Sequence, residues 1–589
     1  MGIYGCMSTA FPLTGVLPST SSVQTMHVPP APDSPEMAPE SATGFTEKAV
    51  VQASQAMIAT ANPLATDAGY EILQQGGSAV DAAIAAQMML GLTEPQSSGI
   101  GGGALLLLYD GTQVVAFDGR ETAPAAATPE RFLDAHGKPL AFRDAVVGGR
   151  SVGVPGVLKM LDMAHKQYGK LLWTTLFQPA IRMAEEGFQI SPRLHLLLAS
   201  DPYLRQAEPA RSYFYQADGA PKAVGTRLHN PDYAGVLRLM AAQGAEAFYR
   251  GKLVTDMVQA VRQHPTRPGD LTAADFAAYE AKQRQPLQST YRGYTVYGMP
   301  PPSAGGIATL QMLGILEHFE LQHYQSLAVD SVHLVAEAGR LAYADRARYV
   351  ADSDFVDVPV AGLLDRRYLA ARSRLISLTQ SLGVAPPGEP YRTKATALGN
   401  DHALELPSTS HITIVDAQGH ALTMTTSIEA AFGSRIMVNG YLLNNQLTDF
   451  AFAPAEQGKP VANRIEARKR PRSAMAPTLV FNQHGKFAMA VGSPGGSAII
   501  NYVAQTLVAM LDWRLDPQQA VSLPHYGSRN GATELEQGRH LEALVPQLEA
   551  RGHKVALIEM TSGLSVIRKT AHGYVGAADP RREGTVRGY

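Results

Sequence analysis

The chain carries a threonine, Thr409, at the start of a predicted β-hairpin, where its hydroxyl could act as a nucleophile. From His411 onward polar and apolar residues alternate, as in a half-buried strand, and the polar turn 416–420 leads into a similar return strand. A turn centred on Gln418 sets Thr409 opposite Ser427, and the Cβ atoms of such paired residues lie about 4.5–5.5 Å apart. A register slip of one residue would turn Ser427 to the other face. Both residue types are also ordinary strand formers, so the pattern alone leaves a purely structural hairpin open.

A glycine-rich loop in the last third of the chain separates a predicted strand from a predicted helix. Residues 486–491 have a strand pattern, the sequence GSPGGS follows at 492–497, and a helix is predicted from Ala498. Backbone N–H groups are unpaired at such a helix N-terminus, and they can stabilise the oxyanion of a tetrahedral intermediate. Neither G-x-x-x-x-G-K-[ST] nor G-x-G-x-x-G is matched, so nucleotide binding is not indicated. An oxyanion hole and a plain tight turn remain as the two interpretations.

Several short segments, taken together and in order, resemble the γ-glutamyltransferase family, also called γ-glutamyltranspeptidase or glutathione hydrolase. The segments are GGSAVDAA at 76–83, GGG at 101–103, RETAP at 120–124, PPPSAGG at 300–306, TSH at 409–411, LLNNQ at 442–446, KRP at 469–471, GSPGG at 492–496 and DPR at 579–581. The resemblance implies an α/β fold, the four-layer αββα sandwich of N-terminal-nucleophile hydrolases. It also implies one precursor chain that is cut into a large subunit, 49–408, and a small subunit, 409–589, which share one core.

The same resemblance makes Thr409 the nucleophile and, after self-cleavage between Ser408 and Thr409, the new N-terminus. A threonine hydroxyl needs an adjacent base, and a free N-terminal amine, with a pKa of about 7.7–8.0, can serve. That base is absent while Thr409 lies in a peptide bond, so cleavage would switch the enzyme on. By resemblance, Gly495 and Gly496 form the oxyanion hole and Ser427 supports the nucleophile.

The resemblance also implies a binding site for a small γ-glutamyl substrate. Arg120 and Ser473 match residues that bind its α-carboxylate, a group that a guanidinium can hold with two hydrogen bonds. Gln446 and Asp449 match groups around its α-amine. Water, an amino acid or a dipeptide would accept the γ-glutamyl group, and no cofactor and no metal are implied.

The sequence departs from the family pattern near this site. Glu429 stands where well-known members carry an asparagine near the α-amine, so it adds a negative charge there. Ala474 replaces a serine and removes one hydroxyl from the carboxylate pocket. The segment between Asp449 and Ser473 is shorter than the active-site lid of other members and holds no tyrosine. We predict that it is a solvated segment giving only partial cover, so that hydrolysis outweighs transfer; its charged residues are Arg464, Glu466, Arg468 and Lys469.

Periodicity places these motifs on a layered α/β framework. Helical material that flanks antiparallel strands favours such a sandwich. Helices are predicted at Leu64–Leu73, Ala79–Leu92 and Ala498–Leu511, hairpins at 104–117, 412–426 and 478–491, and a mostly helical region at 157–349.

Composition excludes several other classes of protein. The 50 basic and 52 acidic residues nearly balance, without long runs of one sign, so neither nucleic acid nor a membrane surface is an expected partner. The single cysteine, Cys6, excludes an internal disulfide framework, and no H-E-x-x-H or C-x-x-C pattern points to a metal. Residues 1–48 are predicted to be a disordered tail. No signal-peptide pattern is found, so we expect a cytoplasmic protein, with a periplasmic location left open.

Three functions therefore remain, with the first favoured. It is attack by Thr409 on a γ-glutamyl amide such as glutathione, through an acyl-enzyme. The second is an acylase of the same fold acting on another amide, such as glutaryl-cephalosporin, although a glutaryl group has no ammonium to pair with Asp449 and Glu429. The third, from another class, is an uncleaved and non-catalytic binding protein.

Overall fold

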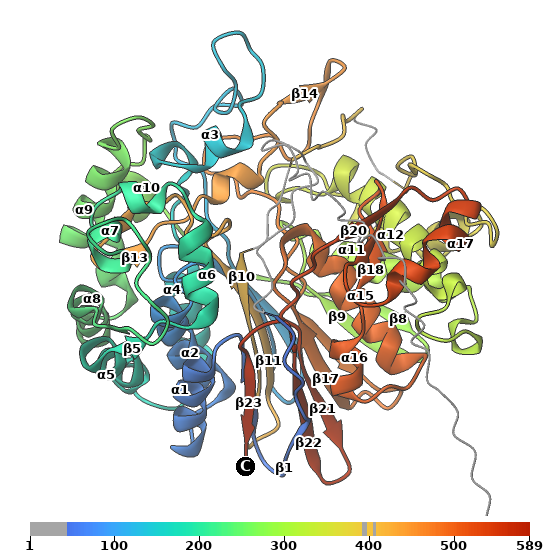
Figure 1. Cartoon of the computed structure of the whole chain (residues 1–589), viewed down its shortest axis with the longest axis horizontal. Coiled ribbons are helices and arrows are strands. Elements are labelled where there is room, and N and C mark those ends of the chain that lie inside the picture. The colour runs from blue at the N-terminus through green and yellow to red at the C-terminus, as the bar shows by residue number, and fades with distance from the viewer. Residues whose placement is uncertain (1–43, 392–396, 404–407) are drawn as a thin grey trace, which may run out of the picture. The chain divides into compact units, whose positions relative to one another are not determined.

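The predicted hairpin around Thr409 lies in the middle of a seven-stranded antiparallel sheet in the computed structural model, which describes residues 44–391, 397–403 and 408–589 (Figure 1). Strands β10 (Thr409–Val415) and β11 (Ala421–Ser427) pair with Thr409 opposite Ser427, so the predicted register is confirmed. Every residue of both strands is buried, so the prediction of a half-buried strand is wrong. The reason is that the hairpin is covered on both faces, by a second sheet and by helices. Residues 1–43 of the predicted tail lie outside the described residues.

Two seven-stranded antiparallel sheets face each other. The first has the order β23 (Thr585–Gly588), β2 (Met57–Thr60), β10, β11, β3 (Gly103–Tyr109), β4 (Val114–Gly119), β7 (Lys282–Arg284). The second has the order β1 (Val51–Ala53), β22 (Gly573–Ala578), β21 (Ser565–Thr570), β17 (Phe487–Gly492), β16 (Thr478–Phe481), β9 (Tyr294–Gly298), β8 (Leu287–Tyr291). Strands β10 and β11 pack against β17, so the hairpin and the strand before the glycine loop meet at the interface of the two sheets.

Helices cover the outer face of each sheet and complete an αββα arrangement. Helices α1 (Pro63–Gln74) and α2 (Ala79–Thr93) lie on the first sheet, and α11 (Gly305–Leu316), α12 (Val329–Tyr349), α15 (Ile499–Leu511) and α16 (Pro517–Ser522) lie on the side of the second (Figure 1). The fold prediction is therefore confirmed in its layers. Among the described residues, none of the helices has the length and apolar character needed to cross a membrane.

The remaining elements surround this sandwich. The other helices are α3 (Phe142–Val146), α4 (Val157–Tyr168), α5 (Gln178–Glu186), α6 (Pro192–Ser200), α7 (Ala210–Phe214), α8 (Pro231–Gln243), α9 (Gly251–Arg262), α10 (Ala273–Ala277), α13 (Val360–Leu363), α14 (Arg366–Ser373) and α17 (Val545–Ala550). Short strands are β5 (Phe188–Gln189), β6 (Arg227–Leu228), β12 (Met437–Val438), β13 (Tyr441–Leu442), β14 (Ala455–Glu456), β15 (Lys459–Pro460), β18 (Tyr526–Ser528), β19 (Thr533–Glu536) and β20 (Val555–Ile558). The region predicted as mostly helical is so, apart from the short strands β5 and β6 and the sheet strands β7, β8 and β9.

Asp416 fastens the hairpin turn to helix α2. One carboxylate oxygen accepts from the backbone N–H groups of Gln418 and His420, at 2.9 and 3.0 Å, and the other accepts from Ala79 N at 3.0 Å. Ala79 is the first residue of α2, and Ser78 caps that helix. An acidic group at a helix N-terminus is stabilised by the unpaired N–H groups and the helix dipole. The turn lies at the other end of the hairpin from Thr409, and it is thereby fixed to α2, whose residues are all buried.

A layer of polar side chains lies between the two sheets. The ring nitrogens of His411 lie 2.9 Å from Thr425 Oγ1 and 3.0 Å from Thr423 Oγ1. The ring packs on Gly492 of β17, where a Cβ atom would lie 2.0 Å from it, so only glycine fits there. Complete burial lowers the pKa of His411 to about 3, which keeps the ring neutral in the folded protein.

We expect His411 to make the stability of the fold depend on pH. The unfolded chain, with a histidine pKa near 6.5, binds more protons than the folded chain between about pH 3 and pH 6.5. The free energy of unfolding that depends on a neutral His411 is therefore fully present above about pH 6.5 and is lost as the pH falls. The loss amounts to about 2 kcal/mol between pH 7 and pH 5. Thermal unfolding of Thr409→Ala, in which the predicted self-cleavage cannot occur, should show a larger fall in Tm over this range than that of Thr409→Ala/His411→Asn. An equal fall in both proteins would contradict the assignment.

Candidate active site

The Thr409 hydroxyl lies beside the peptide bond that precedes it. Thr409 Oγ1 donates to Ser427 Oγ at 3.5 Å, and Ser427 Oγ donates to the carbonyl oxygen of Ser408 at 2.8 Å. Ser427 Oγ also accepts from the backbone N–H of Glu429 at 2.8 Å, and Ser408 Oγ donates to the carbonyl oxygen of Gln96 at 2.5 Å. A donor is thus aimed at the carbonyl of the Ser408–Thr409 bond, next to a hydroxyl that could attack it.

The glycine loop follows strand β17 and leads into α15, as predicted. Gly495 has a φ of +136° and Gly496 a φ of +55°, in the region that favours glycine. A Cβ atom on Gly495 would also lie 2.6 Å from the ring of Tyr502. The chain therefore passes through a conformation that other residues rarely adopt, and it brings Gly496 to the nucleophile.

One pocket collects most of the predicted site residues. It brings together residues from the hairpin, from the end of β4, from the chain around 446–449, from the chain around 473–475 and from the glycine loop. Its lining is Arg120, Thr409, Ser427, Glu429, Gln446, Asp449, Ser473, Ala474, Met475, Gly496 and Ile499. Of the predicted residues, Gly495 and Ser408 lie next to lining residues in the chain without lining the pocket themselves.

Arg120 and Asp449, predicted to bind opposite ends of a substrate, form an ion pair with each other. The guanidinium also donates to the carbonyl oxygens of Pro471, at 3.1 Å, and Arg472, at 2.7 Å. Gln446 Nε2 donates to the same Asp449 oxygen at 2.7 Å. The buried guanidinium is therefore oriented by two backbone carbonyls, and its charge is balanced by a carboxylate that lines the same pocket.

Two further carboxyl groups lie near this ion pair. Glu429 is buried with a φ of +79°, accepts from Asn445 Nδ2 at 2.5 Å, and has its pKa raised well above the usual range by burial and by the nearby charge of Asp449. Glu121 lies 3.8 Å from Arg120, and burial raises its pKa to about 8. The cation that lies near both groups, Arg120, is already paired with Asp449. Both therefore favour the neutral form unless a cation binds.

The segment between Asp449 and Ser473 differs from the prediction of a solvated loop. Lys469 is fully buried, because its ammonium is satisfied by Glu466 Oε1 at 2.9 Å and by the carbonyl oxygen of Ala462 at 2.8 Å. Arg464 and Glu466 are half-buried, and Arg468 is exposed. The prediction is therefore wrong for Lys469, whose charge is paired inside the segment.

Sequence reasoning missed residues that touch the site from outside the quoted motifs. Met475 and Ile499 line the pocket; Met475 follows the predicted residue Ser473 by two positions, and Ile499 follows the GSPGG segment by three. Arg582 Nη1 donates to the carbonyl oxygen of Thr409 at 2.9 Å. Arg582 directly follows the DPR segment at 579–581, and this position is the feature of the sequence that could have identified it.

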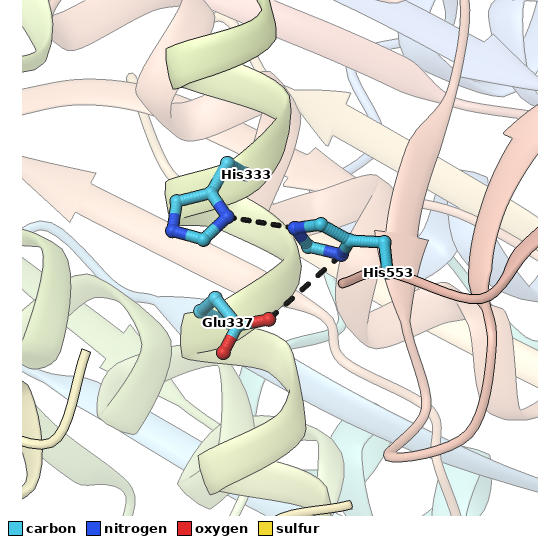
Figure 2. A group of neighbouring side chains, drawn as sticks. All are labelled: His333, Glu337 and His553. Carbon is cyan, nitrogen blue, oxygen red and sulfur yellow. Dashed lines mark hydrogen bonds and ion pairs between the residues drawn. The ribbon is translucent and has the colours of Figure 1, made fainter. Parts of the chain in front are cut away.

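A separate buried group, His333, Glu337 and His553, offers nitrogen and oxygen atoms within 4.8 Å of one another (Figure 2). Figure 2 shows that His553 presents one ring nitrogen to His333, at 2.7 Å, and the other to Glu337, at 3.9 Å. One ion cannot bind both sides of this ring. Glu337 also accepts from Arg340 Nε at 2.8 Å, and His333 Nε2 lies 2.6 Å from the carbonyl oxygen of Ser377. The arrangement fits a hydrogen-bonded clamp between α12 and the chain before β20 better than a metal centre.

The sequence of the chain is similar to those of known proteins. A family model described as gamma-glutamyltranspeptidase matches residues 65–589. The glutathione hydrolase proenzyme of Bacillus subtilis (strain 168) is 37% identical over 546 residues, which cover 90% of this chain and 91% of that protein. The acylase ACY 1 proenzyme of Pseudomonas sp. (strain SE83) is 36% identical over 567 residues, which cover 94% and 97%.

Solved structures give the same result for the fold. The crystal structure of cephalosporin acylase from Bacillus halodurans matches with a TM-score of 0.80 and 27% identity, covering 94% of this chain and 99% of that one. The predicted N-terminal-nucleophile hydrolase sandwich is therefore confirmed. With a matching family model, relatives that align over nearly their whole length and a pocket built around the predicted residues, the chain belongs to the gamma-glutamyltranspeptidase family.

Proposed function

We propose that the chain is the precursor of an amidohydrolase that cuts itself between Ser408 and Thr409 and then removes γ-glutamyl groups from glutathione or related γ-glutamyl amides. The cleavage would leave a large subunit that includes residues 49–408 and a small subunit, 409–589. One observation carries the proposal: a single pocket joins Thr409 and Ser427 to an arginine–carboxylate pair of the kind that an amino acid would bind. The proenzyme names of the relatives support it.

The contacts at the Ser408–Thr409 bond support self-cleavage. Thr409 Oγ1 attacks the carbonyl carbon of Ser408, while the Ser427 hydroxyl stabilises the developing charge on the carbonyl oxygen. The C–N bond breaks, the nitrogen takes the proton from Oγ1, and an ester forms between Ser408 and Thr409. Water then hydrolyses this ester to a Ser408 carboxylate, and Thr409 regains its hydroxyl and gains a free amine.

Turnover uses the amine that cleavage creates. The amine takes the proton of Thr409 Oγ1, the oxygen attacks the γ-carbonyl of the substrate, and the leaving amine receives the proton. N–H groups of Gly495 and Gly496 would face the oxyanion. Water or an amino acid then attacks the acyl-enzyme, with the Thr409 amine again serving as the base.

The charges of the pocket favour an amino-acid-like acyl group. Arg120 and Asp449 neutralise each other in the unloaded pocket. A γ-glutamyl group brings one carboxylate and one ammonium, so each residue exchanges one partner of opposite charge for another. No buried charge is left alone, a state that would be costly.

A second candidate is an acylase on another amide, such as glutaryl-cephalosporin. The similarity to the acylase ACY 1 proenzyme and to the cephalosporin acylase structure favours it. A glutaryl group could bind Arg120 through its terminal carboxylate, but it has no ammonium for Asp449. Asp449 would lose its cation and Glu429 would gain none, so we rank this function second.

Self-cleavage can be tested on the purified protein. We expect a large fragment that ends at Ser408 and a small fragment that starts at Thr409, with Thr409→Ala remaining a single inactive chain. N-terminal sequencing of the small fragment and a denaturing gel provide the measurement. A different first residue would remove Thr409 from its proposed role, and a parent protein that stays at full length would favour a non-catalytic binding protein.

Substrate class can be tested with two pocket variants. Arg120→Ala should lower kcat/KM for a γ-glutamyl anilide by about ten- to a hundredfold, because a charge-assisted hydrogen bond is worth about 1.5–3 kcal/mol. Asp449→Asn should lower it as well but should favour a glutaryl anilide over a γ-glutamyl anilide relative to the parent. Arg182→Ala is the control, since Arg182 is exposed and pairs with Glu71 at the surface.

The γ-glutamyl assignment fails if the parent prefers the glutaryl anilide. It also fails if Asp449→Asn leaves the ratio of the two substrates unchanged.

We also expect hydrolysis to outweigh transfer. The segment 450–472 is too short to form a long lid, so water, at its high bulk concentration, should reach the acyl-enzyme first. Release from a γ-glutamyl anilide should be accelerated little by glycylglycine, with free glutamate as the main product. A large acceleration, with a γ-glutamyl tripeptide as the main product, would refute this expectation.

A further inference from the structure

The glycine loop 492–497 needs support that does not use the N–H groups at its centre. In the proposed mechanism the N–H groups of Gly495 and Gly496 face the oxyanion, so they cannot also fasten the loop to the rest of the fold. Both glycines have positive φ values, so the chain around them must be held through other groups. Ser497, the last residue of the loop, is buried, and it stands between the pocket-lining residues Gly496 and Ile499.

Two side chains from distant parts of the sequence bind Ser497. Arg529 Nη1 donates to the hydroxyl oxygen of Ser497 at 2.9 Å. The hydroxyl of Tyr343, on helix α12, donates to the carbonyl oxygen of Ser497. The end of the loop that leads into α15 is therefore held at two atoms, and neither contact uses an N–H group of the two glycines.

The guanidinium of Arg529 is oriented by a carboxylate. Oε1 of Glu534, on strand β19, accepts from Arg529 Nε at 2.9 Å and from Arg529 Nη2 at 2.6 Å. Two such bonds fix the plane of a guanidinium, because its donors form a rigid fork. Nη1 is thereby directed at Ser497, and the charge of Arg529 is balanced by Glu534.

The backbone that carries Arg529 is also fixed. Arg529 lies in the turn between β18 and β19. A Cβ atom on Gly339 of α12 would lie 2.7 Å from the carbonyl oxygen of Ser528, so β18 is packed closely on that helix. The side chain of Asn530 donates to the carbonyl oxygen of Ala385 at 2.9 Å and accepts from its N–H at 2.7 Å. Both ends of the Arg529 side chain are therefore anchored.

We infer that Arg529 is a positioning residue that holds Ser497, and through it the N–H groups of Gly495 and Gly496, in the geometry that stabilises the oxyanion. Such donors act at about 2.7–3.1 Å from the oxyanion, so a small shift of the loop weakens them. Arg529 does not line the pocket and acts only through the loop. The inference rests on the proposed function, in which the loop is the oxyanion hole.

The test compares Arg529→Met, Ser497→Ala and the double variant in the hydrolysis of a γ-glutamyl anilide. Each single variant should lower kcat by about ten- to a hundredfold. KM should stay near that of the parent, because the oxyanion exists only in the transition state and not in the bound substrate. The double variant should be no slower than the slower single variant, since both substitutions remove the same hydrogen bond.

Self-cleavage and a matched variant provide the controls. In the proposed processing step Ser427 stabilises the carbonyl oxygen and the glycine loop takes no part, so all three variants should cleave themselves like the parent on a denaturing gel. Arg587→Met should keep the parent's kcat, since Arg587 is also paired with a carboxylate, that of Asp67, but is exposed on β23. If Arg529→Met fails to cleave itself, Ser497→Ala decides the question alone, because it removes only the acceptor.

An unchanged kcat in the single variants would overturn the inference. A raised KM with an unchanged kcat would also overturn it, because the contact would then serve substrate binding. So would a double variant whose loss equals the product of the two single losses, because Arg529 and Ser497 would then act independently. Failure of the proposed function differs from these outcomes, since the parent itself would then yield no small fragment beginning at Thr409 or release no glutamate.

Discussion

The pairing of Thr409 with Ser427 across a fully buried hairpin is the constraint on which the rest of the site depends. Both hydroxyls sit at the first pair of the ladder, where the strand order of the first sheet and the packing of β17 leave them no freedom to slip. Asp416 fixes the far end of the hairpin to helix α2, and Gly492 leaves room for the ring of His411 between the sheets. The position of one hydroxyl is therefore set by contacts made along the whole length of two strands.

In the proposed function, electrostatic pairing determines what the pocket can accept. An isolated charge in a buried site is costly, and an arginine with a carboxylate partner avoids that cost. Arg120 is held by the carbonyls that precede Ser473, and Asp449 is held by Gln446, so the two charged groups are oriented by separate parts of the chain. A ligand that carries both charges replaces the pair without leaving either group alone. A ligand with one charge cannot do so.

Local periodicity predicts much of the hairpin and of the site. The features that it does not predict depend on contacts between parts of the chain far apart in the sequence. The alternation from His411 and the turn at Gln418 were enough for the register, because strand pairing has a period of two. The same alternation predicts a half-buried strand, in which polar side chains such as Thr423 and Thr425 would face solvent. They face His411 inside the sandwich instead, and no local pattern shows that a second sheet will cover them. Lys469 was misassigned for a similar reason, because its partners became visible only once the segment had folded on itself.

Ser427 links the proposed processing step to the proposed catalytic step. A serine hydroxyl has one hydrogen to donate and two lone pairs to accept. In the uncleaved chain that hydrogen is given to the carbonyl oxygen of Ser408, while the lone pairs face the Thr409 hydroxyl and the Glu429 N–H. Cleavage separates the Ser408 carbonyl from Thr409, so it frees the hydrogen but leaves the Thr409 hydroxyl and the Glu429 N–H in place. In the proposed mechanism, that hydrogen can be given to the Thr409 oxygen once the amine has taken its proton, and the same geometry serves both reactions without rearranging the sheet.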